Sequence, residues 1–171
     1  MDNLLKWSQL QTGAIKLFKE EIQLTQLINS VISLFDAASG QKNIRIITEI
    51  RENPIIFADM VSMSSILRNL ISNAIKFSKI GEKIIIKVEE DDKSIRLCVS
   101  DYGVGIPREI INQLFTLERP SISGTLNEKG SGLGLILTKE LTEKNDGTIE
   151  VESTINVGTT FILSFPKVIA K

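Results

Sequence analysis

One stretch of the sequence, residues 60–79 ("MVSMSSILRNLISNAIKFSK"), carries polar side chains whose types and spacing suit a metal ion and a phosphate group. On a helix that turns about 100° per residue, Asn69, Asn73 and Lys76 cluster within roughly 60° of one another. Two asparagines in mid-helix are locally unfavourable, because their amides compete for nearby backbone groups. Amide oxygens suit a hard cation such as Mg²⁺, and a lysine one turn further on can reach a phosphate oxygen. The alternative is an ordinary solvated helix face.

A second stretch, "SDYGVGIP" at residues 100–107, ends a run of alternating apolar residues with a carboxylate and two glycines. Asp101 can accept a hydrogen bond from an amino group where the strand gives way to a loop. Gly103 and Gly105, followed by Ile106, would let a ligand approach the backbone without a Cβ in the way. Taken alone, a turn after a strand explains the glycines better.

Two further glycine motifs lie near the C-terminal end of the sequence. "GSGLGL" places Gly130, Gly132 and Gly134 where a loop opens a helix, and the unpaired amides of a helix N-terminus favour phosphate. Its spacing is not that of a dinucleotide fingerprint, which disfavours a nicotinamide cofactor. "VGTTF" adds Thr159 and Thr160 at the start of the last strand, where a simple hairpin turn is the alternative.

The elements that must position these residues follow from apolar periodicity and turn signals. Met63, Ile66, Leu67, Leu70 and Ile71 give the helix over 60–79 a core-facing stripe, and Asp59 can cap its N-terminus. Residues 116–131 show no periodicity and are interpreted as a long loop, of a length that is usually functional or mobile. The remaining predicted elements are helices over 25–38, 132–144 and after Pro107, and strands at 21–25, 44–50, 55–58, 83–90, 94–101, 148–153 and 159–165, the last two forming a hairpin.

Composition limits the class of protein. The 171 residues, 42% of them apolar, suffice for one compact α/β domain. A formal net charge of -1 argues against nucleic acid as a partner. The single cysteine, Cys98, suits a reducing compartment, and no long apolar segment stands near the start, so we expect a cytoplasmic piece without membrane contact of its own.

The order and spacing of the motifs carry more information than any one of them. "NLISNAIKFS", "DYGVGI", a long loop, "GSGLGL" and "GTTF" together resemble the N, G1, G2 and G3 boxes of the histidine-kinase catalytic domain. That domain shares a superfamily with gyrase, a heat-shock chaperone and mismatch-repair ATPases. The resemblance spans about residues 20–167. It implies an α/β (α+β) two-layer sandwich, in which helices cover one face of a mixed, mostly antiparallel sheet, the Bergerat ATP-binding fold.

The resemblance also implies roles for individual residues. Asn73 would coordinate the Mg²⁺ that bridges the ATP phosphates, with Asn69 assisting and Lys76 contacting phosphate, so these three are the predicted catalytic residues. Asp101 would accept the adenine amino group, and Gly105 would shape the adenine pocket. The remaining predicted nucleotide-binding residues are Gly103 and Ile106 in the same motif, Gly130, Gly132, Leu133 and Gly134 at the phosphate end of an ATP lid over about 116–131, and Thr159 and Thr160 near the adenine.

Two departures from the family pattern limit what the resemblance implies, and position 69 discriminates within the superfamily. Tyr102 stands where the family more often has a small or amide residue, which leaves its role open. Phe115 and Leu117 match the phenylalanine box only in part, so the geometry of lid closure is in doubt. Asn69 occupies the place at which the ATP-hydrolysing members resemble one another in carrying a glutamate. No base for water attack is evident, which favours transfer of the phosphoryl group to another protein.

The sequence contains no histidine, although the family transfers phosphate to one. Residues 1–19 resemble the end of the second helix of the family's dimerisation hairpin, and residues 20–171 form the predicted catalytic domain. We therefore expect a fragment that is mostly monomeric and cannot phosphorylate itself on histidine. Its partners would be its own dimerisation and phosphoacceptor domain and, through that domain, a response regulator. A module that binds nucleotide without transfer and a serine kinase of the anti-sigma type remain alternatives.

Overall fold

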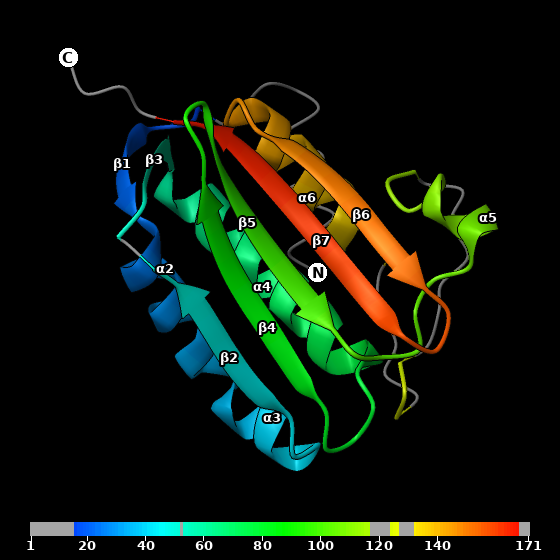
Figure 1. The fold of residues 1–171 in the computed structure, drawn as a ribbon. Helices are drawn as coiled ribbons and strands as arrows, with labels where there is room; N and C mark the ends of the chain where they lie inside the picture. Colours follow the sequence, from blue (N-terminus) through cyan, green and yellow to red (C-terminus); the bar gives the residue numbers. More distant parts are fainter. Residues whose placement is uncertain (1–15, 52, 117–123, 127–131, 168–171) are drawn as a thin grey trace.

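The computed structural model describes residues 16–51, 53–116, 124–126 and 132–167, and Figure 1 shows their arrangement. The strands are β1 (Lys19–Gln23), β2 (Arg45–Ile50), β3 (Ile55–Asp59), β4 (Lys83–Glu90), β5 (Ser94–Asp101), β6 (Thr148–Thr154) and β7 (Gly158–Pro166). The helices are α2 (Leu24–Ile32), the 3₁₀ helix η1 (Ser33–Phe35), α3 (Asp36–Gln41), α4 (Met60–Phe77), α5 (Arg108–Ile111) and α6 (Gly134–Lys144).

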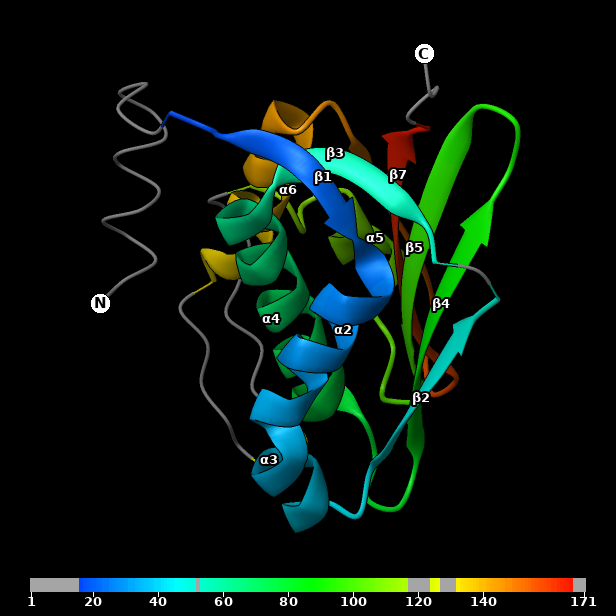
Figure 2. The same ribbon diagram turned by 90° about the vertical axis from the view of Figure 1, so that its left-hand side faces the viewer.

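The main sheet has five strands in the order β2-β4-β5-β7-β6. Only β2 and β4 run parallel, and the other neighbours pair antiparallel. A separate antiparallel pair joins β1 to β3. Figure 2 shows α2 and α4 together on one side of the sheet. The two-layer sandwich with a mixed, mostly antiparallel sheet is thus confirmed.

The core lies between α4 and the inner face of the sheet. Along β5 the side chains of Ile95, Leu97 and Val99 are buried, as expected when alternate residues of a strand face the same side. They meet the predicted apolar stripe of α4, whose members Met63, Ile66, Leu67, Leu70 and Ile71 are fully buried. In the part of the chain that the structure describes, no helix is both long and apolar enough to cross a lipid bilayer.

Each predicted helix and strand is present in the structure, with differences in bounds. The helix expected over 25–38 is divided into α2, η1 and α3. Hydroxyl groups of Ser30, Ser33 and Ser39 each donate to the carbonyl three residues earlier, and such local bonds compete with regular helical pairing. Helix α6 begins at residue 134 rather than 132. Most of the predicted linker and most of the predicted lid lie outside the described residues.

Asp59 caps α4 as predicted. Its Oδ1 accepts from the backbone N–H and from the hydroxyl of Ser62, both at 2.7 Å, and its Oδ2 accepts from the backbone N–H of Phe18 at 3.0 Å. Burial alone would raise the pKa of Asp59, but these hydrogen bonds outweigh burial and lower that pKa. The backbone N–H of Asp59 in turn donates to Oδ1 of Asn145 at the end of α6. This end of α4 is therefore tied to both the incoming chain and α6.

The other end of α4 is held by a buried lysine. Lys42, only 3% exposed, donates from Nζ to the carbonyls of Ile75 and Lys76, each at 2.9 Å, and to Oγ1 of Thr125 at 2.7 Å. Its positive charge lies at the negative end of the helix macrodipole and satisfies carbonyls that have no partner within the helix. Lys42 therefore fixes the end of α4 that carries Asn73 and Lys76.

We predict that Lys42→Met lowers the free energy of unfolding by about 2–3 kcal/mol, since it removes a charged donor from buried carbonyls. Lys93→Met is the matched control, because Lys93 lies exposed in the β4–β5 turn, where substitutions change stability by about 0.5 kcal/mol or less. Urea denaturation of both variants measures the difference. Equal stability of the two would contradict the role assigned to Lys42.

Candidate functional site

Residues from four separate parts of the chain form a pocket between the second half of α4 and the ends of β5 and β7. Five of the predicted site residues meet there: Asn73, Asp101, Gly105, Ile106 and Thr159. The other lining residues are apolar: Phe77, Val104, Leu114, Leu135 and Phe161. The structure thus brings residues of all four sequence motifs to one place.

Asp101 is the buried charged group of this pocket. The residue is 8% exposed, and its Oδ1 accepts from the backbone N–H of Gly103 at 2.9 Å. Burial raises the pKa of Asp101 to about 6, although hydrogen bonds from the backbone N–H groups of Gly103 and Thr159 oppose the rise. A carboxylate whose charged form is disfavoured in the free protein gains from any ligand that donates a hydrogen bond to it.

The apolar walls were missed by the sequence reasoning. Phe77, Leu135 and Phe161 lie within the quoted motifs, but they follow the periodicity of core residues, and the pocket is an extension of the core, so periodicity does not separate the two. Apolar walls with a few convergent polar groups are typical of small-molecule sites. The free space is about 40 Å³, against the roughly 300–1,000 Å³ of ordinary ligand pockets. A bound base therefore requires the walls to move apart.

The two glycines after Asp101 are required by the packing of the chain on itself. A Cβ on Gly103 would overlap with the carbonyl oxygen of Phe77 at the end of α4. Gly105 has a φ of +69°, and a Cβ there would overlap with the carbonyl oxygen of Thr154. These two glycines were predicted to leave space for a ligand. The space beside their Cα atoms is occupied by other segments of the chain, so the glycines also serve the packing of the fold.

The polar edge of α4 is present as predicted, but its three members have different surroundings. Asn73 lines the pocket. Asn69 donates from Nδ2 to Oγ1 of Thr138 on α6 at 2.7 Å. Lys76 lies with Nζ 4.8 Å from the centroid of the Phe77 ring, an attractive cation–π contact beside the pocket. Only Asn73 of the three is therefore part of the pocket wall.

The glycine-rich motif before α6 is described in part. Gly130 lies outside the described residues. Gly132 has a φ of +74°, a left-handed conformation that favours glycine, and Leu133 precedes the first turn of α6. A Cβ on Gly134 would overlap with the Asn69 amide, so this glycine lets α6 approach α4 closely.

The two threonines of the last motif lie on opposite faces of the sheet, because neighbouring residues of a strand alternate. Thr159 is buried in the pocket, and its hydroxyl lies 2.9 Å from that of Ser153. Thr160 instead pairs with the hydroxyl of Ser100 on the opposite face of the sheet. The structure therefore separates Thr160 from the pocket, contrary to the expectation that both threonines lie near the adenine. Ser153, which sequence reasoning missed, also accepts from the backbone N–H of Ile106 at 2.8 Å.

Of the residues that depart from the family pattern, Tyr102 and Phe115 lie in the described part of the structure. The ring of Tyr102 lies 5.1 Å from Nζ of Lys83 on β4, and Tyr102 is not among the pocket-lining residues. Phe115 packs against the core and lies 5.9 Å from Nζ of Lys139. Leu117 lies outside the described residues. Tyr102 thus contacts the first residue of β4 rather than the pocket.

No group of three or more histidine, cysteine, aspartate or glutamate side chains that could hold a metal ion is found among the described residues. The oxygen donors of the pocket for a hard cation are the amide of Asn73, the carboxyl of Asp101 and the hydroxyl of Thr159. Mg²⁺ commonly keeps several waters and takes few protein ligands when a nucleotide supplies phosphate oxygens. The donor set fits a magnesium ion that arrives with phosphates, and it does not fit a metal bound by protein side chains alone.

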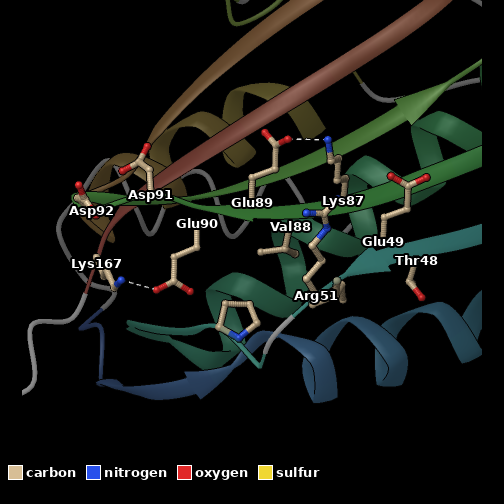
Figure 3. Close-up of a pocket in the computed structure, with 12 residues that line it drawn as sticks. Thr48, Glu49, Arg51, Lys87, Val88, Glu89, Glu90, Asp91, Asp92 and Lys167 are labelled. Carbon is tan, nitrogen blue, oxygen red and sulfur yellow. Dashed lines mark ion pairs between the residues drawn. The ribbon is translucent and has the colours of Figure 1, made fainter.

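A larger hollow, of about 850 Å³, lies at the far ends of β2 and β4 (Figure 3). None of the predicted site residues lines it. Two of its three basic side chains are used in ion pairs, Lys87 with Glu89 at 2.5 Å and Lys167 with Glu90 at 2.6 Å. Its acidic side chains outnumber the basic ones, so this hollow is unsuited to phosphates.

Both the sequence and the fold of this chain are similar to those of known histidine kinases. The chain is 33% identical over 98% of its length to Sporulation kinase A of Bacillus subtilis, of which the match covers 26%. The catalytic domain of the histidine kinase ThkA superposes with a TM-score of 0.78 at 30% identity, covering 88% of this chain and 97% of that domain. ThkA has also been solved in complex with the response regulator protein TrrA, with a TM-score of 0.75 at 25% identity over 96% of this chain and 47% of that one.

A third solved structure, full-length ShkA in complex with AMPPNP, has a TM-score of 0.83 at 25% identity, covering 99% of this chain and 36% of that chain. The chain spans about a third or less of the curated relatives it matches first. A family model described as "Histidine kinase-, DNA gyrase B-, and HSP90-like ATPase" matches residues 58–169, which include α4, the pocket and all three glycine motifs. The chain belongs to this family, as a histidine-kinase-type ATPase domain of the kind found in sensor kinases.

Proposed function

We propose that the chain binds Mg²⁺ and ATP in the pocket between α4 and the ends of β5 and β7, and donates the γ-phosphoryl group to a histidine on another domain. The observation that carries the proposal is the buried carboxylate of Asp101 at the end of an apolar pocket, with Asn73 on the facing helix. The complex of ShkA with AMPPNP supports the choice of nucleotide.

The chemistry of Asp101 favours adenine over guanine. The exocyclic amino group of adenine is a hydrogen-bond donor, whereas guanine presents a carbonyl oxygen at the same ring position. A carboxylate, which only accepts when ionised, attracts the first and repels the second. The N–H of Gly103 holds Oδ1 and so fixes the orientation of the carboxyl. The apolar side chains of Ile106 and Phe161 would cover the faces of the base.

The phosphates would lie toward α6 and the polar edge of α4. Asn73 would hold the Mg²⁺, which neutralises phosphate charge when bound, and Lys76 would contact a phosphate oxygen. The N-terminus of α6 begins at Gly134, beside Asn69, and helix N-termini favour phosphate groups. Gly132 and Leu133 would present backbone groups at the same end of the ligand.

Two features support transfer to a protein rather than to water. The residue at position 69 is a neutral amide, whose Nδ2 is engaged by Thr138, so it cannot take a proton from water. The chain has no histidine and therefore needs an acceptor on another domain. We propose that this acceptor belongs to a dimerisation and phosphoacceptor domain and that it passes the phosphoryl group to a response regulator, a type of partner that ThkA binds.

The first prediction concerns Asp101→Asn and nucleotide affinity. An asparagine can keep the bond from Gly103, but one of its two polar atoms is then an NH₂ group that faces the adenine amino group. We expect affinity for ADP to fall about tenfold or more, by isothermal titration calorimetry. Ser100→Ala, on the opposite face of the sheet, is the control and should bind as the wild type does. Unchanged affinity in Asp101→Asn would overturn the assignment of the adenine site.

The second prediction concerns the same substitution and stability. The pKa of Asp101 is raised by folding from 3.8 to about 6, so the native state holds this proton more tightly than the unfolded state. The contribution of Asp101 to the free energy of unfolding therefore falls as pH rises from about 4 to about 6. At pH 7 the ionised carboxylate lowers the free energy of unfolding by roughly 3 kcal/mol. We expect ligand-free Asp101→Asn to be more stable than the wild type at pH 7, with the difference disappearing near pH 4. Urea denaturation at both pH values measures it, and a difference independent of pH would contradict the cause.

The third prediction concerns Asn73→Ala. Removing the amide should abolish the gain in ADP affinity that Mg²⁺ provides, so that affinities in Mg²⁺ and in EDTA become equal, while metal-free binding persists. Ser72→Ala, an exposed neighbour on the same helix, is the matched control. If Asn73→Ala retains the full Mg²⁺ dependence, the metal is held elsewhere.

The fourth prediction separates transfer from binding alone. Mixing the domain with a matching histidine-containing acceptor domain and ATP labelled in the γ-phosphate should place acid-labile phosphate on the acceptor. Asn73→Ala should abolish the label. ATP binding without transfer to any acceptor would favour the alternative of a pure nucleotide-binding module.

A further inference from the structure

The side chain of Thr138 on α6 joins the polar edge of α4 to the start of α6. Thr138 is 1% exposed. Its Oγ1 lies 2.7 Å from Nδ2 of Asn69 and 2.9 Å from the carbonyl oxygen of Gly134. A single buried hydroxyl thus contacts both the first asparagine of α4 and the first residue of α6.

These contacts determine which way the Asn69 amide points. The hydroxyl of Thr138 has one hydrogen, and it donates that hydrogen to the carbonyl of Gly134. It can then only accept from Asn69, so the NH₂ group of Asn69 must face Thr138. The amide oxygen of Asn69 lies on the other side, against the Cα of Gly134, where a Cβ would overlap with it.

An asparagine amide without such a partner can rotate by half a turn and exchange its oxygen for its NH₂ group, because the two ends have nearly the same shape. Only the oxygen attracts a cation. An NH₂ group directed at the same point would repel it. The orientation of Asn69 therefore decides whether this residue assists a metal ion or opposes it.

We propose that Thr138 is a positioning residue for the metal-dependent step of nucleotide binding. It holds the amide of Asn69 with its oxygen toward the start of α6, and Gly134 provides the space that this oxygen needs. The inference rests on the proposed function, because it assigns Asn69 a role toward Mg²⁺ that arrives with the nucleotide. It adds a residue outside the motifs that the sequence singles out.

The test compares ADP affinity in Mg²⁺ with ADP affinity in EDTA for the full chain. Thr138→Val keeps the shape of the side chain and removes the hydroxyl, so we expect the ratio of the two affinities to fall about three- to tenfold, the equivalent of one hydrogen bond. Thr138→Ser retains the hydroxyl and should restore the ratio. In the Asn69→Ala background, Thr138→Val should have no additional effect on the ratio.

Thr142→Val is the matched control. Thr142 is buried one turn further along α6 and donates to the carbonyl of Thr138, but it makes no hydrogen bond to Asn69. It should lower the thermal midpoint as Thr138→Val does and leave the affinity ratio unchanged. If Thr138→Val does not fold, Thr138→Ala provides the same comparison with less crowding.

The outcomes separate this inference from the proposed function. A wild-type ratio near one would overturn the proposed use of Mg²⁺ itself. A high wild-type ratio that persists in both Thr138→Val and Thr138→Ala would overturn only the role of Thr138. A fall in the ratio that Thr142→Val reproduces would show a general loosening of α6, and it would also overturn the positioning role.

Discussion

The rotation of α4 about its own axis is the constraint on which the site depends. Burial of Met63, Ile66, Leu67, Leu70 and Ile71 against the sheet leaves the helix a single orientation, since any other would expose several large apolar side chains. Asp59 and Lys42 hold its two ends by hydrogen bonds. With α4 fixed in this way, the polar edge at positions 69, 73 and 76 can face only α6 and the pocket. The energy that orients the candidate site comes from the core, at positions that contact no ligand.

Asp101, unlike the core residues of α4, lines the pocket and lowers the stability of the fold. Its burial raises its pKa to about 6, so the charged form destabilises the free domain at neutral pH. The backbone N–H groups of Gly103 and Thr159 offset only part of that cost. A ligand amino group would offset more of it. A residue that weakens the fold while completing a pocket is typical of a binding site rather than of a core.

Much of the fold could be predicted, because its signals are local. Alternation predicted β5, the apolar stripe predicted α4, and a single residue, Asp59, predicted where α4 begins. The site could be predicted only in part. Asp101 and Asn73, which line the pocket, were predicted as site residues, whereas Leu114, Leu135 and Phe161 were not, because a pocket wall continuous with the core has the same pattern as the core. The bond between Asn69 and Thr138 joins residues 69 positions apart, and no local pattern encodes such a pairing.

The glycines of the motifs have a double role. Gly103 makes room for the end of α4, Gly105 for the β6–β7 hairpin, and Gly134 for the Asn69 amide. In each case the space is used by the chain itself, so a larger residue would displace part of the site before any nucleotide arrived. Loss of binding in a glycine variant is therefore no proof that the glycine contacts the ligand. The close approach of four chain segments, which these glycines permit, is what places a carboxylate, an amide and apolar walls around one small volume.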